Sequence, residues 1–276
     1  SQNWQAGFLP GIFQGTYVDT RHTELEKLIE NVRNDRISGG EQTQQLSLLR
    51  LLNRQHLEQR PGDAQLESRI QSFELAFRMQ TDAADAFDVS REPRHILEMY
   101  GEGVQARQIL IARRLVERGV RFVQVWHGEG QPWDNHDDIE VNHARLARQC
   151  DQAIAALLTD LKQRGLLDDT LIIWGGEFGR TIYSQGALTE TNYGRDHHPR
   201  CFTIWMAGGG VKPGIVYGET DELGYNIVKD PVHVHDFQAT VMSLFGYDHE
   251  KLIYKHQGRR YRLTDVSGHV IKSILT

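Results

Sequence analysis

Apolar residues recur every three or four positions through most of the first 120 residues, which is the spacing of amphipathic helices. This pattern predicts helices over residues 22–34, 41–59, 64–78 and 103–119. The Gln- and Arg-rich outer positions of these helices are expected to be solvated surface. Residues 1 to about 20 show no clear period and are expected to be irregular.

After Gly119 the pattern changes to short apolar runs separated by polar loops. It predicts strands over residues 121–126, 170–174 and 201–207, and helices over residues 139–164 and 234–245. A nearly all-apolar run such as 170–174 is typical of a parallel strand that is covered on both faces. The order strand, helix, strand, loop, strand, helix predicts an α/β fold with a doubly wound, mainly parallel sheet.

The length of 276 residues allows one large α/β domain or two small ones. We expect a helical part over residues 1–119 and an α/β core over residues 120–276, within one domain overall. The chain starts at Ser1 without a methionine, which is typical of a processed or trimmed product.

Composition narrows the choice of partners and compartments. The net charge of −6 argues against nucleic acid, because phosphate binding usually leaves a basic footprint. No apolar run approaches the ~20 residues that span a membrane. The two cysteines, Cys150 and Cys201, form no CxxC spacing and are expected to be buried free thiols.

Three polar loops contain residue types that bind metals, at residues 127–138, 175–181 and 193–199. In an open α/β sheet, ligands bind beyond the carboxyl ends of the strands, so the three loops are expected to converge. Carboxylate and imidazole together suit Zn, Mn or Fe more than Mg or Ca, which prefer oxygen ligands. The loops therefore predict a divalent metal site, with Zn or Mn preferred over Mg or Ca.

The candidate ligands are Asp134, His136, Glu177, His197 and His198. Each has a purely structural alternative. Asp134 or His136 would stabilise the N-terminus of the following helix, Glu177 would pair with Arg180, and the adjacent histidines would bond loop backbone. The spacing matches no HExxH signature, so the alternatives stay open on the residues alone.

Several longer motifs carry a family resemblance. They are Gly175–Thr181 (GGEFGRT), Gly194–Phe202 (GRDHHPRCF), Ala207–Gly210 (AGGG) and His233–Thr240 (HVHDFQAT). With these motifs the chain resembles the DUF1501 family over essentially its whole length. That family in turn resembles the alkaline-phosphatase and sulfatase-like superfamily, which implies an alkaline-phosphatase-like parallel sheet with a metal site at its carboxyl edge.

The resemblance implies roles for the candidate residues. Asp134 and His136 match an Asp and His that precede a long helix in the superfamily, and His197 matches its final histidine, with His198 as the alternative. Glu177 and Phe178 stand in place of an Asp-His pair. Phenylalanine cannot bind a metal, so a second metal site would lack a ligand. The nucleophile of the superfamily is not identified in this chain, and the resemblance implies that the segment carrying it lies upstream, so that the domain is expected to be incomplete at its N-terminus.

The implied activity is metal-dependent hydrolysis of phosphate or sulfate esters, with Arg180 or Arg195 contacting an ester oxygen. The substrate would be an anionic small molecule or a polysaccharide ester. The alternative is a non-catalytic, metal-stabilised binding or envelope protein that has kept the fold. The resemblance also implies a periplasmic or secreted location.

His233 and His235 are expected to cap a helix or to bond loop backbone.

Overall fold

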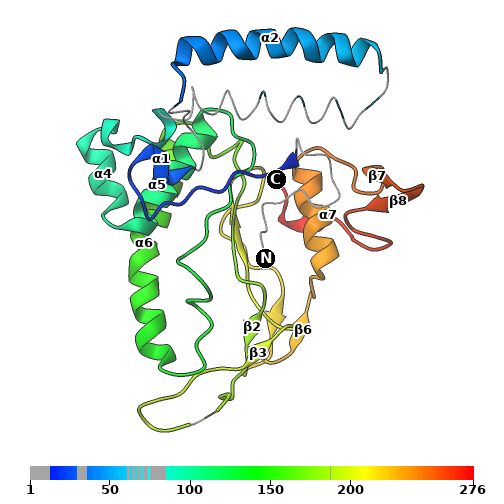
Figure 1. The fold of residues 1–276 in the computed structure, drawn as a ribbon. Helices are drawn as coiled ribbons and strands as arrows, with labels where there is room; N and C mark the ends of the chain where they lie inside the picture. Colours follow the sequence, from blue (N-terminus) through cyan, green and yellow to red (C-terminus); the bar gives the residue numbers. More distant parts are fainter. Residues whose placement is uncertain are drawn as a thin grey trace. The chain divides into compact units, whose positions relative to one another are not determined.

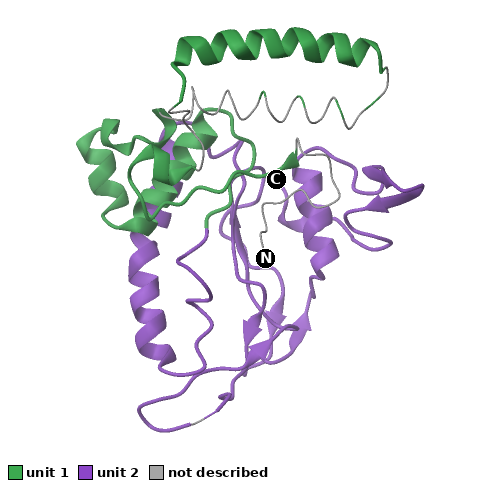
Figure 2. Ribbon diagram, in the orientation of Figure 1, with its two compact units in different colours: residues 1–125 green, residues 126–276 purple. Residues whose placement is uncertain are grey.

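A computed structural model describes residues 13–29, 36–60, 63, 66, 70, 74, 85–186 and 188–276. The chain divides into two compact units, residues 1–125 (unit 1) and residues 126–276 (unit 2), coloured separately in Figure 2.

Helices dominate the described part of unit 1 (Figure 1). They are α1 (Leu25–Leu28), α2 (Gly39–Glu58), the 3-10 helix η2 (Val89–Arg91), α4 (Arg94–Tyr100) and α5 (Val104–Glu117). The predicted helices over 41–59 and 103–119 are confirmed as α2 and α5. Residues 22–29 of the predicted 22–34 helix are described, and only α1 is helical among them. Nearly all of the predicted 64–78 helix lies outside the described residues.

Local signals explain where these helices begin and end. The Ser38 hydroxyl accepts a hydrogen bond from the Glu41 N–H, and the Glu41 carboxylate accepts one from the Ser38 N–H, so α2 begins with a capping box. Helix α5 stops just before Gly119, whose φ of +86° is unfavourable for residues with a side chain. No residue of α2 is buried among the described residues, whereas the middle of α5 is buried.

Helix α5 carries two arginines into the interior of unit 1. Arg113 and Arg114 are 1% and 4% exposed, and both contact the Glu92 carboxylate, which is itself buried. Arg113 Nη2 lies 2.7 Å from Glu92 Oε2, and Arg114 Nη1 bonds Glu92 Oε1. Arg114 Nε also donates to the Ala86 carbonyl at 2.9 Å. The prediction that the arginines of this stretch lie on solvated surface is therefore wrong for these two.

Unit 2 contains two long helices and several very short strands. Its helices are α6 (Ile139–Gln163), α7 (Val234–Leu244) and the 3-10 helix η3 (Lys272–Ile274). The predicted helices over 139–164 and 234–245 are confirmed. Helix α7 begins with a capping box in which the His233 ring accepts from the His235 N–H and Asp236 accepts from the His233 N–H. The expected capping role of His233 is thus confirmed.

Every sheet among the described residues is a two-stranded antiparallel ladder. The pairs are β1 (Ile172–Trp174) with β4 (Trp205–Ala207), β2 (Gly179–Arg180) with β3 (His197–His198), β5 (Glu219–Thr220) with β6 (Ile227–Lys229), and β7 (Ile253–His256) with β8 (Arg259–Arg262). The prediction of a doubly wound, mainly parallel sheet of alkaline-phosphatase-like type is contradicted.

The connection between β1 and β4 explains the difference. Parallel neighbours need a crossover, usually a helix, whereas residues 175–204 form loops and the short β2–β3 ladder. The chain therefore doubles back, and Trp174 pairs with Trp205 in an antiparallel register. Ile173 and Trp174 are 43% and 44% exposed, so β1 is not covered on both faces. The strand predicted over 121–126 is unpaired in the structure.

Both cysteines lie in unit 2 and are buried free thiols, as predicted. Cys150 is in the middle of α6, and Cys201 follows β3. Burial raises the pKa of both thiols. Among the described residues, no helix is long and apolar enough to cross a membrane.

Candidate metal centre

Backbone hydrogen bonds bring the three polar loops of unit 2 together. The loop before α6 is joined to the third loop, because the Arg195 N–H donates to the Asn135 carbonyl at 3.2 Å and the Ile139 N–H donates to the Tyr193 carbonyl at 3.1 Å. The loop after β1 is joined to the third loop by the β2–β3 ladder, in which Arg180 pairs with His197. The loops therefore converge without the parallel sheet that was expected to align them.

Gly194 allows the closest of these approaches. A Cβ atom at this position would lie 2.0 Å from the carbonyl carbon of His136 and 2.4 Å from its Cα atom. Both atoms belong to the backbone, which cannot move aside as a flexible side chain would. Only glycine therefore fits where the third loop crosses the loop that carries His136.

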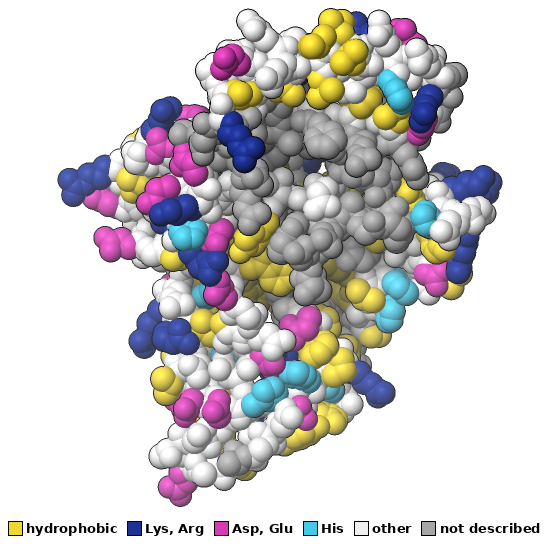
Figure 3. Space-filling model, viewed as in Figure 1, with side chains coloured by type: hydrophobic (Ala, Val, Ile, Leu, Met, Phe, Trp, Pro, Cys, Tyr) yellow, Lys and Arg dark blue, Asp and Glu magenta, His cyan; other side chains and the backbone are white. Residues whose placement is uncertain are grey.

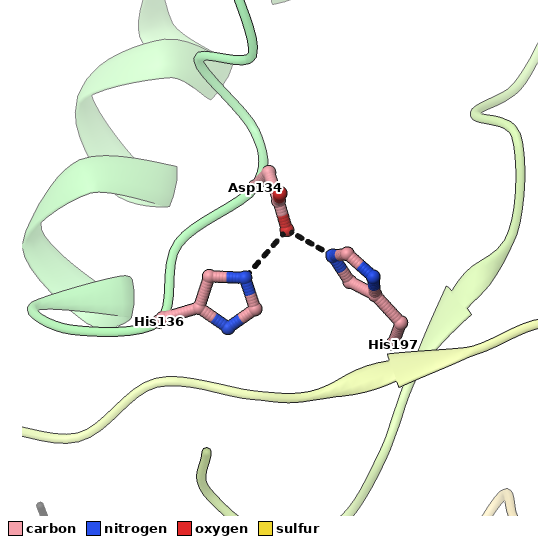
Figure 4. Close-up of side chains that lie close together, drawn as sticks. All are labelled: Asp134, His136 and His197. Atoms are coloured by element: carbon pink, nitrogen blue, oxygen red, sulfur yellow. Dashed lines mark hydrogen bonds and ion pairs between the residues drawn. The ribbon is translucent and has the colours of Figure 1, made fainter. Parts of the chain in front are cut away.

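Three candidate ligands meet at this crossing (Figure 4). Asp134 Oδ1 lies 2.8 Å from His197 Nε2 and 3.2 Å from His136 Nε2. Each residue offers one ligand atom, and the three atoms lie within 4.8 Å of one another. We call these three residues the Asp134 cluster. Asp134 and His136 are half-buried and His197 is exposed, so the cluster does not lie in the core of unit 2.

Arg180 supplies a positive charge beside the Asp134 cluster. Its Nη2 lies 3.1 Å from the same Oδ1 atom of Asp134, and its side chain is 18% exposed. Burial raises the pKa of Asp134, but the hydrogen bond from His197 and the charges of Arg180, His197 and His136 outweigh it, so the pKa is lowered overall. Asp134 is therefore ionised at neutral pH, as a metal ligand must be.

The other candidate ligands lie outside the cluster. The Glu177 side chain is 62% exposed and lies 3.4 Å from Arg180 Nη2, as in its structural alternative. His198 is buried, its Nε2 lies 2.6 Å from the Tyr225 carbonyl, and its ring stacks on that of Tyr225. Successive residues of a strand point to opposite faces, so only one of His197 and His198 faces Asp134.

Arg195 also lies apart from the cluster. Its guanidinium donates to the Ile182 carbonyl and lies 5.9 Å from the Tyr193 ring. It therefore links the third loop to the backbone at Ile182, and it forms no ion pair with Asp134 in the described structure.

The sequence did not single out every residue that builds the site. Thr181 is 3% exposed, its hydroxyl donates to the Tyr183 carbonyl at 2.7 Å, and it accepts from the Asp196 N–H at 3.0 Å. The Phe178 ring lies 5.4 Å from that of His197 and forms a wall of the site. Neither Thr181 nor Gly194 shows a signal in the sequence beyond its place in a motif.

The donor set fits a divalent metal of the zinc type. One carboxylate oxygen and two imidazole nitrogens are the ligands of many open zinc sites, and they also suit Mn and Fe. Among the described residues, buried polar side-chain atoms without a hydrogen-bond partner include Asn135 Oδ1, His136 Nδ1 and Arg180 Nε. Such atoms are rare in proteins and often mark a place where an ion or ordered water completes the network.

Comparison with known proteins gives one result. The model of the family described as "Protein of unknown function (DUF1501)" matches residues 1–275. No curated protein matches the chain, and no solved structure does. Because the match covers nearly every residue and includes all the loops of the site, the chain belongs to the DUF1501 family.

Proposed function

We propose that this chain binds a divalent metal, Zn or Mn in preference to Mg or Ca, and hydrolyses phosphate or sulfate esters. The observation that carries the proposal is the Asp134 cluster beside Arg180. Three protein ligands are typical of catalytic metal sites, whereas structural zinc sites usually have four. The order of Asp134, His136 and His197 along the chain also resembles the ligand order of alkaline-phosphatase and sulfatase-like enzymes.

In this proposal, different residues bind the metal and the substrate. Asp134, His136 and His197 would hold the metal, which would supply Lewis-acid chemistry for activating the ester and water. Arg180 orients an anionic ester oxygen through its planar guanidinium, which matches phosphate and sulfate in a bidentate manner. The hydroxyl of Thr181 is engaged by Tyr183 and Asp196, so water is the proposed nucleophile. An anionic small molecule or a polysaccharide ester is the proposed substrate.

The second candidate is a non-catalytic protein, such as an envelope-associated binding protein, in which a metal stabilises the loops. The position of Arg180 favours it, because a guanidinium 3.1 Å from Asp134 already balances that carboxylate. The two candidates share the metal and differ in turnover. A periplasmic or secreted location suits both and is part of the proposal.

Metal content tests the site directly. Purified protein should contain stoichiometric Zn or Mn by elemental analysis, and Asp134→Asn and His197→Ala should each lower metal affinity by at least about a hundredfold, since even outer-shell partners contribute ten- to a hundredfold. His95→Ala, which removes an exposed histidine of unit 1, should leave metal content unchanged. Glu177→Ala should also retain the metal, because this carboxylate lies outside the cluster.

Activity then separates the two candidates. The metal-loaded protein should hydrolyse aryl phosphate or aryl sulfate esters, and Arg180→Gln should lower kcat/KM while metal content stays near stoichiometric. Bound metal without turnover of either ester class would support the non-catalytic candidate. A protein that takes up no metal after supplementation would refute both.

A further inference from the structure

The hairpin formed by β7 and β8 has a continuous register of four residue pairs. Its two-residue turn, Gln257-Gly258, has positive φ angles of 48° and 81°, which is the type I′ geometry that favours tight hairpins. The ladder pairs Tyr254 with Tyr261, Lys255 with Arg260, and His256 with Arg259. This register decides which side chains share a face.

One face of the hairpin concentrates positive charge. Lys255 and Arg260 are directly opposite each other, and Arg262 lies two residues further along the same face, about 7 Å away. Lys255 and Arg260 are both exposed. Figure 3 shows Lys and Arg side chains gathered where the hairpin projects. We call Lys255, Arg260 and Arg262 the cationic face.

Two members of the cationic face, Lys255 and Arg260, have no carboxylate partner among the described residues. The cations near them do: Lys251 pairs with Asp248 at 2.7 Å, and Arg262, the half-buried third member of the face, lies 4.0 Å from Glu250 and donates to the Asp265 carbonyl. Lys255 and Arg260 form no ion pair with any described residue. Like charges directly opposite in a ladder destabilise it, so the pair costs stability in a chain whose net charge is −6. An anion placed between the two side chains would remove that repulsion.

The aromatic side chains of the hairpin lie on the other face. Tyr254 and Tyr261 face each other there, and the Arg259 guanidinium lies 5.0 Å from the centre of the Tyr261 ring. The cationic face therefore offers charge and hydrogen-bond donors without a ring on which a base could stack. Exposed leucines flank the two ends of the hairpin, Leu252 before β7 and Leu263 after β8, away from its turn.

We propose that the cationic face binds a linear polyanion of the acidic-polysaccharide class, which carries sulfate or carboxylate groups. Guanidinium and ammonium groups on facing positions of a ladder match repeated anionic groups on a chain, and Arg binds sulfate or carboxylate in a bidentate manner. Single-stranded nucleic acid is disfavoured because it relies on aromatic stacking. A membrane surface is disfavoured because the exposed apolar residues lie at the base of the hairpin and not at its tip. This inference goes beyond the proposed function and does not depend on the metal centre.

The test uses the full-length chain and dextran sulfate, with neutral dextran as the control probe. At about 0.15 M salt, the wild type should bind dextran sulfate and not dextran, and affinity should fall as salt rises. The double variant Lys255→Gln/Arg260→Gln should bind at least about tenfold more weakly. Its Tm should be equal to or higher than that of the wild type, since a like-charge pair is removed.

A matched pair of single variants separates a specific face from general charge. Arg260→Gln and Arg259→Gln remove the same charge at adjacent positions on opposite faces. Only Arg260→Gln should weaken binding clearly. Equal losses in the two variants, absence of binding by the wild type, or tighter binding to duplex DNA or to anionic phospholipid vesicles than to dextran sulfate would each overturn the proposal.

Discussion

Replacing Glu92 by Gln should lower the free energy of unfolding by about 3–5 kcal/mol, the cost typical of breaking a buried ion pair. Arg113 and Arg114 both contact this carboxylate, and they are 1% and 4% exposed. Without it, two guanidinium groups remain buried with only the partial compensation of Glu117 and backbone carbonyls. Urea denaturation followed by circular dichroism measures the change.

Glu98→Gln is the matched control for Glu92→Gln. Glu98 also pairs with an arginine, Arg94 at 2.7 Å, but the two side chains are 62% and 92% exposed. Exposed pairs contribute at most about 1 kcal/mol, so this variant should unfold almost as the wild type does. Equal effects in the two variants would show that burial of Glu92, Arg113 and Arg114 does not determine how much their ion pairs contribute to the free energy of unfolding.

The ion pairs of Glu92 should also make the stability of the protein depend on pH in the acid range. Burial raises the pKa of Glu92, but hydrogen bonds from Arg113 and Arg114 and their charges outweigh it, so the pKa of the folded state is lowered. A lowered pKa means that the stabilisation is complete above the unfolded pKa of about 4.3 and is lost as pH falls through the folded pKa. The stability of Glu92→Gln should therefore fall less steeply than that of the wild type below about pH 4.

Gly194→Ala should disrupt the metal centre without changing any ligand. The added Cβ would lie 2.0 Å from the His136 carbonyl carbon, so the loop that carries Asp134 and His136 must move away from the loop that carries His197. We expect metal affinity to fall by at least about tenfold, as when supporting residues of a metal site are removed. Elemental analysis and the metal-induced rise in Tm measure it.

Gly176→Ala provides the control in the same group of loops. A Cβ at Gly176 would lie 3.7 Å from the nearest atom, the Phe178 carbonyl oxygen, which is an ordinary contact. This variant should retain metal and stability. If Gly194→Ala also retained both, the close crossing of the two loops would not be needed to assemble the Asp134 cluster.

The helices could be predicted from the sequence because their signal is local. The bounds of α5, α6 and α7 follow the apolar period, and glycines lie just beyond their ends. The segment 170–174 was also predicted as extended, and β1 lies within it. The predicted parallel direction was wrong, because an apolar run shows burial tendency and not strand direction. The absence of helical periodicity between Trp174 and Cys201 was the signal against a parallel crossover.

The candidate site depends on contacts between residues far apart in the sequence, which local patterns do not predict. Residue types in the loops pointed to Asp134, His136 and His197, but 63 residues separate Asp134 from His197, and no local pattern fixes such a contact. The choice between His197 and His198 depends on which face of β3 meets the first loop. Likewise, no sequence pattern indicated that Arg113 and Arg114 are buried, since a charged side chain is usually exposed unless a distant partner compensates it.

The reactivity of the two buried cysteines can be used to measure local opening of unit 2. Cys150 and Cys201 are 7% and 5% exposed, and unit 1 contains no cysteine. Only an accessible thiolate reacts with alkylating or disulfide reagents, so native labelling should be slow and should follow the opening of unit 2. Labelling rates with and without added metal would thus measure how strongly the loops close around an ion. Opening of unit 1 would not add to these rates, because unit 1 contains no cysteine.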